Sequence, residues 1–359
     1  MGSYFDLFLV FAVALVLALI LMPVFRALAV RFGLVDKPNL RKVHTTPVPL
    51  VGGAVVFISS ALAILIVPGI FENFSTLFPL LIGATILLLV GVVDDRIDVR
   101  AIYKLCIQLG LAYYVFASGI RIDSMYGVFG VYDLPEFLQF FLTIVVIAGT
   151  VNAFNLTDGI DGLAAGLAIF GFLAFSVIAL ILGEWFLLTF FLAVTGALIS
   201  FLRYNLSKHK KVFMGDAGSL VLGYILVVSA IMLLQQAQVT GYMRYTLATV
   251  LGILALPVID ALRVFRRRIK TGYSPFRADK THLHHLILTF GVNHKLASAI
   301  IVSIALLILI IALVSGSFFS ITLSVILILF AFGVISGISQ LNNQMSIWRN
   351  KVEELEKQQ

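Results

Sequence analysis

The feature that most constrains this 359-residue chain is a series of eleven apolar runs, each close to 20 residues long and almost free of charge. A run of about 20 apolar residues crosses a bilayer as a helix, because a helix satisfies its own backbone hydrogen bonds in the hydrocarbon core. With 61% hydrophobic and 12% charged residues, the composition is also far from that of a soluble domain. The sequence therefore predicts an all-α integral membrane protein with about eleven transmembrane helices. The runs lie at about 5–25, 50–68, 77–93, 101–118, 136–151, 163–182, 185–202, 218–235, 244–262, 296–315 and 318–338.

The basic residues predict the orientation of these helices. If the loop 26–49 lies inside, 23 of the 25 Lys and Arg residues lie on the same side, and only Arg121 and Arg244 lie outside. Because basic loops stay in the cytoplasm, we expect the N-terminus outside and the C-terminus in the cytoplasm. Residues 1–340 form one polytopic domain in this interpretation, and residues 341–359 form a charged cytoplasmic tail. The single Cys106 is expected to be a small buried residue of the fourth span.

Four short polar segments interrupt the apolar pattern, and the predicted topology places all four on the cytoplasmic face. Ionisable groups are costly at membrane depth, so their concentration at one face indicates a site there. We expect the four segments to form one cytoplasmic cleft. They are Val93-Asp-Asp-Arg96, Asn152-Ala-Phe-Asn-Leu-Thr-Asp-Gly-Ile-Asp-Gly162, Val212-Phe-Met-Gly-Asp216 and His282-Leu-His-His285.

The first two segments each have a structural and a functional interpretation. The Asp94-Asp95 doublet is either a solvated turn with local ion pairs or a catalytic pair, in which one carboxylate takes a proton and the other shapes a metal's outer shell. In the second segment, turn chemistry explains the Asp-Gly pairs, and Asp161 is a possible cap for a helix that starts at Leu163. It does not explain the remaining polar residues at the same depth, which are Asn152, Asn155 and Asp158.

The third and fourth segments point to phosphate and a hard cation. A helix that starts near Asp216 presents amide groups to an anion, but the carboxylate repels phosphate unless a divalent ion lies between them. Oxygen ligands favour Mg²⁺ or Mn²⁺. Phe213 either stacks on a base or lies at the membrane edge. The histidines allow a zinc site, but no Cys partner accompanies them, so hydrogen bonds to phosphate or sugar fit better.

Together these residues favour metal-assisted phosphoryl transfer between a soluble phosphate-rich substrate and a substrate held in the membrane. A secondary transporter is the alternative of another class. Transporters place ionisable groups near the middle of broken helices, whereas almost every charge here lies at loop depth, with Asp6 and Asp260 near span ends.

The four segments, in this order and across nearly the whole chain, resemble those of the polyprenyl-phosphate N-acetylhexosamine-1-phosphate transferases (glycosyltransferase 4 type). The second and third segments are the most specific to that family. Gly33-Leu-Val-Asp-Lys-Pro38 and the His282-Leu-His-His285 pattern are most similar to the WecA/TagO type. The resemblance implies a bacterial inner-membrane protein that transfers GlcNAc-1-phosphate from UDP-GlcNAc to undecaprenyl phosphate, with Mg²⁺, and releases UMP. UDP-MurNAc-pentapeptide or another UDP-N-acetylhexosamine remains an alternative donor. Membrane lipids are expected partners and nucleic acid is not, while monomer and homodimer both remain open.

The resemblance also implies roles for individual residues. Asp216 is the expected metal ligand, with Asn155 as a second one. The candidate catalytic carboxylates are Asp94, Asp95, Asp158 and Asp161, of which the last two also line the nucleotide site. The other expected substrate-binding residues are Asn152, Phe213 (against uracil), Lys42, His282, His284 and His285. Direct attack by the lipid phosphate is favoured over an aspartyl intermediate, because that phosphate is already a competent nucleophile.

Overall fold

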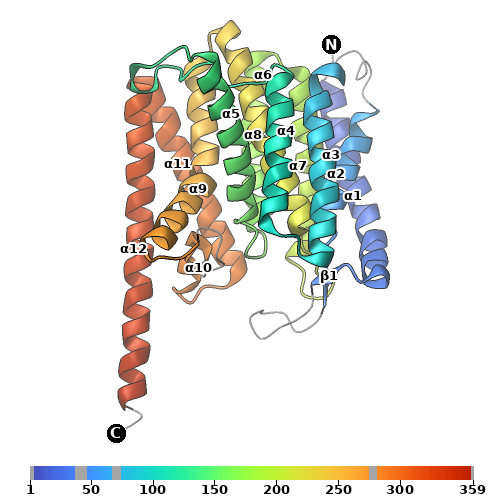
Figure 1. Cartoon of the computed structure of the whole chain (residues 1–359). Helices are drawn as coiled ribbons and strands as arrows, with labels where there is room; N and C mark the ends of the chain where they lie inside the picture. Colours follow the sequence, from blue (N-terminus) through green and yellow to red (C-terminus); the bar gives the residue numbers. More distant parts are fainter. Residues whose placement is uncertain (1–3, 37–46, 67–73, 275–280, 357–359) are drawn as a thin grey trace.

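The computed structural model describes residues 4–36, 47–66, 74–274 and 281–356, and these form a bundle of long helices (Figure 1). Each of the eleven apolar runs is a helix, which confirms the all-α membrane class. In the described residues, nine helices are long and apolar enough to cross a membrane, and α2 and α4 are shorter apolar helices. The helices are α1 (Tyr4–Phe32), α2 (Gly52–Ile64), α3 (Phe74–Ile97), α4 (Ala101–Ala117), α5 (Glu136–Asn155), α6 (Leu163–Leu182), α7 (Trp185–Asn205), α8 (Gly215–Thr240), α9 (Met243–Lys270), α10 (Leu283–Leu288), α11 (His294–Phe318) and α12 (Ile321–Glu356).

Helix α8 is the centre of the bundle, and nearly all of its residues are buried. It packs against α3 and α5, and the Tyr224 hydroxyl donates a hydrogen bond of 2.9 Å to the carbonyl of Pro79 in α3. Near its start, α8 touches the backbones of its neighbours, since a Cβ atom on Gly53 of α2 would overlap Gly218. A Cβ atom on Gly91 of α3 would overlap Ala217 in the same way. Such close packing of small residues is how helices associate strongly inside a membrane.

One end of the bundle gathers the polar segments. Helices α3 and α5 end there, α4 and α8 begin there, and α10 lies beside them (Figure 1). Two short antiparallel strands, β1 (Val35–Asp36) and β2 (Val48–Pro49), pair at this end. Helix α1 starts at the opposite end, and α12 extends past the polar end as one continuous helix (Figure 1).

Two helices extend beyond their apolar runs, and one local expectation differs from the structure. Helix α9 continues past its apolar run to Lys270, and α10 forms at Leu283–Leu288. Arg and Lys are good helix formers, so the basic stretch extends α9 beyond its apolar run. Helix α12 likewise continues past its apolar run to Glu356, so most of the predicted tail, residues 341–359, is helical. Cys106 is exposed, not buried, because it lies on the outward stripe of α4 with Ile102 and Leu109.

Candidate active site

Helix α8 begins with its free amide groups already bound to Asp95. The Asp95 carboxylate accepts a hydrogen bond of 2.8 Å from the amide of Asp216 and one of 3.4 Å from the amide of Ala217. Gly215 precedes them with a φ of +74°, and a Cβ atom there would overlap Asp95. The expectation that this helix start binds a substrate anion is therefore wrong: a carboxylate from α3 occupies it.

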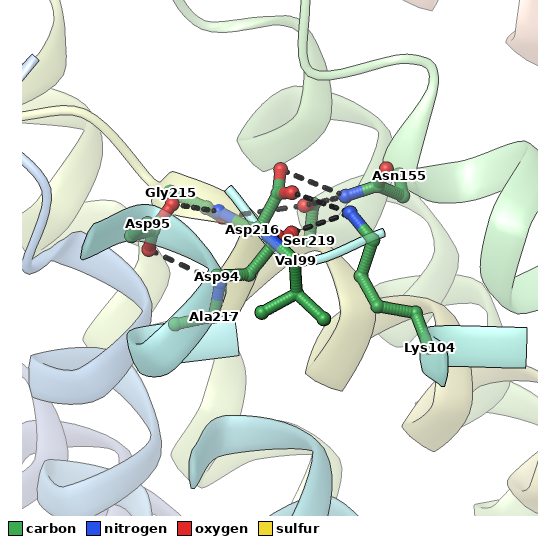
Figure 2. A network of polar contacts seen from close by, with 9 residues as sticks. All are labelled: Asp94, Asp95, Val99, Lys104, Asn155, Gly215, Asp216, Ala217 and Ser219. Carbon is green, nitrogen blue, oxygen red and sulfur yellow. Dashed lines mark hydrogen bonds and ion pairs between the residues drawn. The ribbon is translucent and has the colours of Figure 1, made fainter. Parts of the chain in front are cut away.

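Asp94, Lys104, Asn155 and Asp216 form one connected polar cluster (Figure 2). Lys104 Nζ forms ion pairs with Asp94 Oδ2 and, at 3.4 Å, with Asp216 Oδ2. Asn155 Nδ2 donates to Asp216 Oδ1 at 3.1 Å and to Ser219 Oγ at 2.8 Å. Lys104 is the only cation among the nine residues drawn, which include three carboxylates, and it pairs with two of these, Asp94 and Asp216. The cluster therefore carries an excess of negative charge that a further cation would stabilise.

The loop after α5 adds two more carboxylates with different surroundings. Asp158 reaches the surface, yet the protein atoms around it remove water and raise its pKa to about 7, and the carboxylates of Asp216, Asp95 and Asp161 add to the rise. Burial alone would raise the pKa of Asp161 as well, but His294 and Lys211 bind it and hold its pKa below the ordinary value. The surroundings thus shift the pKa values of the two carboxylates in opposite directions.

Asp161 does not cap α6, as one interpretation of the sequence predicted. Its carboxylate pairs with Lys211 Nζ at 2.6 Å and lies 3.6 Å from His294 Nδ1, and the N-cap position of α6 is Gly162. The Lys211 ammonium group lies 5.2 Å from the centre of the Phe213 ring. Asp161, Lys211 and Phe213 therefore lie side by side at one edge of the site.

Asn205 holds the second and third polar segments together. Its Oδ1 accepts a hydrogen bond of 2.6 Å from the amide of Gly162, and its Nδ2 donates one of 2.9 Å to the carbonyl of Val212. Because Asn205 is buried, both bonds lie out of water, where unpaired polar groups are costly. The side chain fixes the two loops relative to one another.

The histidine segment is anchored by a carboxylate of α9. Asp260 is buried, accepts hydrogen bonds from Arg263 Nη2 at 2.7 Å and the Leu283 amide at 3.1 Å, and lies 2.9 Å from His282 Nδ1. An ionised carboxylate can only accept, so the His282 ring carries a proton on Nδ1. His282 Nε2 is buried and has no hydrogen-bond partner among the described residues.

His284 connects this segment to the Asp158 loop. Its ring packs so closely on Gly159 that a Cβ atom there would overlap it, and the His285 ring centre lies 4.2 Å from its own. Burial, and to a smaller extent the charge of His285, lowers the pKa of His284 to about 3. His284 is therefore a neutral hydrogen-bonding group at physiological pH.

A large apolar cavity opens beside this cluster. It measures about 920 Å³ and lies between α4, α5, α8, α9 and α12. Its lining is mainly aliphatic, while Lys104, Asn155 and Arg268 line it near the polar end of the bundle. A charged site thus borders a cavity suited to a long apolar chain.

Comparison with known proteins tests the resemblance found in the sequence. Residues 77–234 match the sequence model of glycosyl transferase family 4. A probable undecaprenyl-phosphate N-acetylglucosaminyl 1-phosphate transferase of Bacillus subtilis (strain 168) is 33% identical over 312 residues, which cover 86% of this chain and 84% of that protein. The chain belongs to glycosyl transferase family 4. Its resemblance to polyprenyl-phosphate N-acetylhexosamine-1-phosphate transferases is confirmed.

Two further relatives of the family 4 chain carry closely similar names. The undecaprenyl-phosphate alpha-N-acetylglucosaminyl 1-phosphate transferase of Yersinia pestis is 34% identical over 296 residues, 80% of this chain and 79% of the relative. The protein of the same name in Escherichia coli (strain K12) is also 34% identical over 296 residues, 79% of this chain and 78% of the relative.

The residues predicted for this family 4 site that the structure describes lie at the same end of the bundle. Asn152 faces the cavity one turn before Asn155 and bonds Gln108 of α4, not the nucleotide-side carboxylates. Lys42 lies outside the described residues. The sequence interpretation missed Lys104, although a lone Lys inside an apolar run is itself a signal of function.

The donor set fits a hard divalent cation with few protein ligands. Asp216 and Asn155 lie together, and the Asp158 carboxylate is close enough to be influenced by the Asp216 charge. Among the described side chains, no group of three or more His, Cys, Asp or Glu residues is arranged to hold a metal. Mg²⁺ often binds through one or two carboxylates together with substrate phosphates and water, so two protein ligands suffice.

Proposed function

We propose that this protein transfers GlcNAc-1-phosphate from UDP-GlcNAc to undecaprenyl phosphate and releases UMP, forming the lipid-linked sugar that begins a cell-envelope polysaccharide. One observation carries the proposal: the Asp94–Lys104–Asp216 cluster borders an apolar cavity of about 920 Å³. Chemistry between a nucleotide sugar and a lipid phosphate needs this combination of a charged site and an apolar channel. The names of the bacterial relatives support the same reaction.

The proposed topology has eleven spans in a bacterial inner membrane, with α2 and α4 as short spans, the N-terminus outside and the site in the cytoplasm. The basic residues support this orientation, because 23 of the 25 would lie on the side of the site. UDP-sugars are made in the cytoplasm, so the site then faces its soluble substrate.

In the proposed reaction, an oxygen of the lipid phosphate attacks the β-phosphorus of UDP-GlcNAc. The bond from the β-phosphorus to the bridging oxygen breaks, and UMP leaves with that oxygen. Lys104 lies between Asp94 and Asp216 and is placed to orient the attacking phosphate at the cavity mouth. Because positioning and charge stabilisation dominate phosphoryl transfer, no covalent enzyme intermediate is required.

Asp216 and Asn155 are the proposed ligands of Mg²⁺, which when bound would neutralise charge on the diphosphate. The opposite edge of the site, with Asp158, Asp161 and Phe213, is assigned to the nucleotide. The histidine segment is assigned to the sugar, since neutral His284 is suited to hydrogen bonds with hydroxyl groups.

A release assay tests the proposal. Purified protein is incubated with undecaprenyl phosphate, Mg²⁺ and one of several donors: UDP-GlcNAc, UDP-GalNAc, UDP-MurNAc-pentapeptide and UDP-glucose. We expect UMP with UDP-GlcNAc and a lipid-linked GlcNAc diphosphate product. Asp216→Asn should abolish release, whereas Asp123→Asn in the α4–α5 connection, at the other end of the bundle, should not. Release with UDP-MurNAc-pentapeptide alone would change the donor, and no release with any donor would refute the proposal.

A further inference from the structure

A buried amide pair lies inside the cavity, one helical turn away from the charged cluster. Gln108 of α4 follows Lys104 by four residues, so both lie on the same face of the helix and both line the cavity. Gln108 is only 2% exposed. Its Oε1 accepts a hydrogen bond from Asn152 Nδ2 of α5. The pair is therefore a polar element within a mainly aliphatic wall.

The orientation of both amides is fixed by a backbone group. Asn152 Nδ2 also donates a hydrogen bond of 2.8 Å to the carbonyl of Ala148, which can only accept. The Asn152 NH₂ group must therefore point toward Ala148 and Gln108, and Gln108 must accept the hydrogen bond through its side-chain oxygen. The remaining group, Gln108 Nε2, is buried and has no hydrogen-bond partner within the described part of the chain. A buried donor without a partner is costly, and such groups often mark the place of a ligand.

The surroundings define the chemistry of that ligand. It must offer an acceptor to Gln108 Nε2, lie within reach of Lys104 and tolerate aliphatic neighbours such as Leu105 and Leu109. A phosphate oxygen at the head of a polyprenyl chain meets all three requirements, because the head carries the acceptors and the chain follows the aliphatic wall. A nucleotide meets only the first two.

We propose that Gln108 Nε2 donates a hydrogen bond to the phosphate of the lipid acceptor, so that Gln108 and Lys104 together bind that phosphate. Asn152 acts through Gln108 as a positioning residue that keeps the Gln108 amide in this orientation. This inference rests on the proposed function, and it assigns Asn152 to the lipid side of the site instead of the nucleotide side.

Two substitutions of Gln108 distinguish the contribution of its Nε2 donor from that of the rest of the side chain. Gln108→Glu keeps the length and the acceptor for Asn152 but offers no donor to the cavity. Gln108→Met removes both polar groups. The matched control is Gln235→Met, since Gln235 is a glutamine of α8 that bonds the carbonyl of Gly119 at the opposite end of the bundle. Initial rates of UMP release are measured while either substrate is varied and the other is saturating.

Both Gln108 variants should raise the KM for undecaprenyl phosphate about tenfold or more, because a hydrogen bond to a charged group is lost. The KM for UDP-GlcNAc and the parameters of Gln235→Met should be unchanged. A rise in the KM for UDP-GlcNAc instead would show that the amide faces the acetamido group of the sugar. An unchanged lipid KM in both variants would make Gln108 purely structural. Either result overturns the inference.

A binding measurement keeps this inference separate from the proposed function. Undecaprenyl phosphate alone should raise the Tm of the wild-type protein and of Gln235→Met, but raise that of the Gln108 variants much less. UMP with Mg²⁺ should stabilise all of them equally, which shows that the variants are folded. If the wild type releases no UMP, the proposed reaction fails. The role of Gln108 in lipid binding fails separately, if undecaprenyl phosphate raises the Tm of the wild type and of the Gln108 variants equally.

Discussion

The neutral state of buried His284 makes the histidine segment sensitive to acid. The pKa of His284 is about 3 in the folded protein because of burial, against an ordinary value of 6.5. When the segment opens, the ring regains its ordinary pKa. The open state therefore binds a proton below pH 6.5 while the closed state does not, so the closed state loses stability as pH falls from 6.5 toward 3. Between pH 7.5 and pH 5.0 the loss is about 2 kcal/mol, at roughly 1.4 kcal/mol per pH unit below the ordinary pKa.

Hydrogen exchange of the α10 amides, corrected for intrinsic rates, measures this loss directly. From pH 7.5 to 5.0 their protection should fall about 30-fold in the wild type, which corresponds to the same free energy. His284→Gln should show a much weaker pH dependence, because glutamine does not titrate. His209→Gln is the matched control, since His209 is exposed in the loop before α8. An equal pH dependence in wild type and His284→Gln would refute the reasoning, as would an imidazole that titrates near 6.5 by NMR.

The remaining predictions concern single groups of the site. Asp216→Asn should abolish UMP release, a loss of about 100-fold or more, while the protein stays folded by size-exclusion chromatography, because it removes a proposed carboxylate ligand of Mg²⁺. Gly159→Ala should lower the Tm and raise the KM for UDP-GlcNAc, since its Cβ atom would overlap a histidine ring; Gly149→Ala, where no atom lies within 4 Å, should leave both unchanged. Asp260→Asn should lower α10 protection by about 3 kcal/mol or more, because Arg263 would lose its buried partner.

The helices and the meeting of the polar segments were predictable because both follow from the bilayer. Apolar length alone identified the helices, and the alternation of the predicted spans put Asp94, Asn155 and Asp216 at the same end. Those three residues lie together in Figure 2, as expected from their shared depth. No property of the local sequence was needed beyond polarity and order.

The partners of these residues were not predictable, because they depend on which helices pack side by side. Asp95 binds the start of α8, which lies 121 residues away in the sequence, and this contact removed the anion site expected there. Asp161 pairs with Lys211 instead of capping the next helix. In both cases the local sequence predicted an interaction at a helix end, and a charged group from a distant part of the chain formed a different interaction there. Asn152 likewise found its partner, Gln108, on a neighbouring helix.

The contact between the backbones of Gly53 and Gly218 limits what can move when substrates bind. The backbone of Gly91 in α3 contacts that of Ala217 in the same manner. The start of α8, which carries Asp216, is therefore in direct backbone contact with both α2 and α3. A hinge there would have to separate whole helices. Adjustment to differently sized substrates therefore falls to the α5–α6 connection and to α10. Relatives that diverge in donor sugar should accordingly differ in those two segments while this three-helix crossing keeps its glycines.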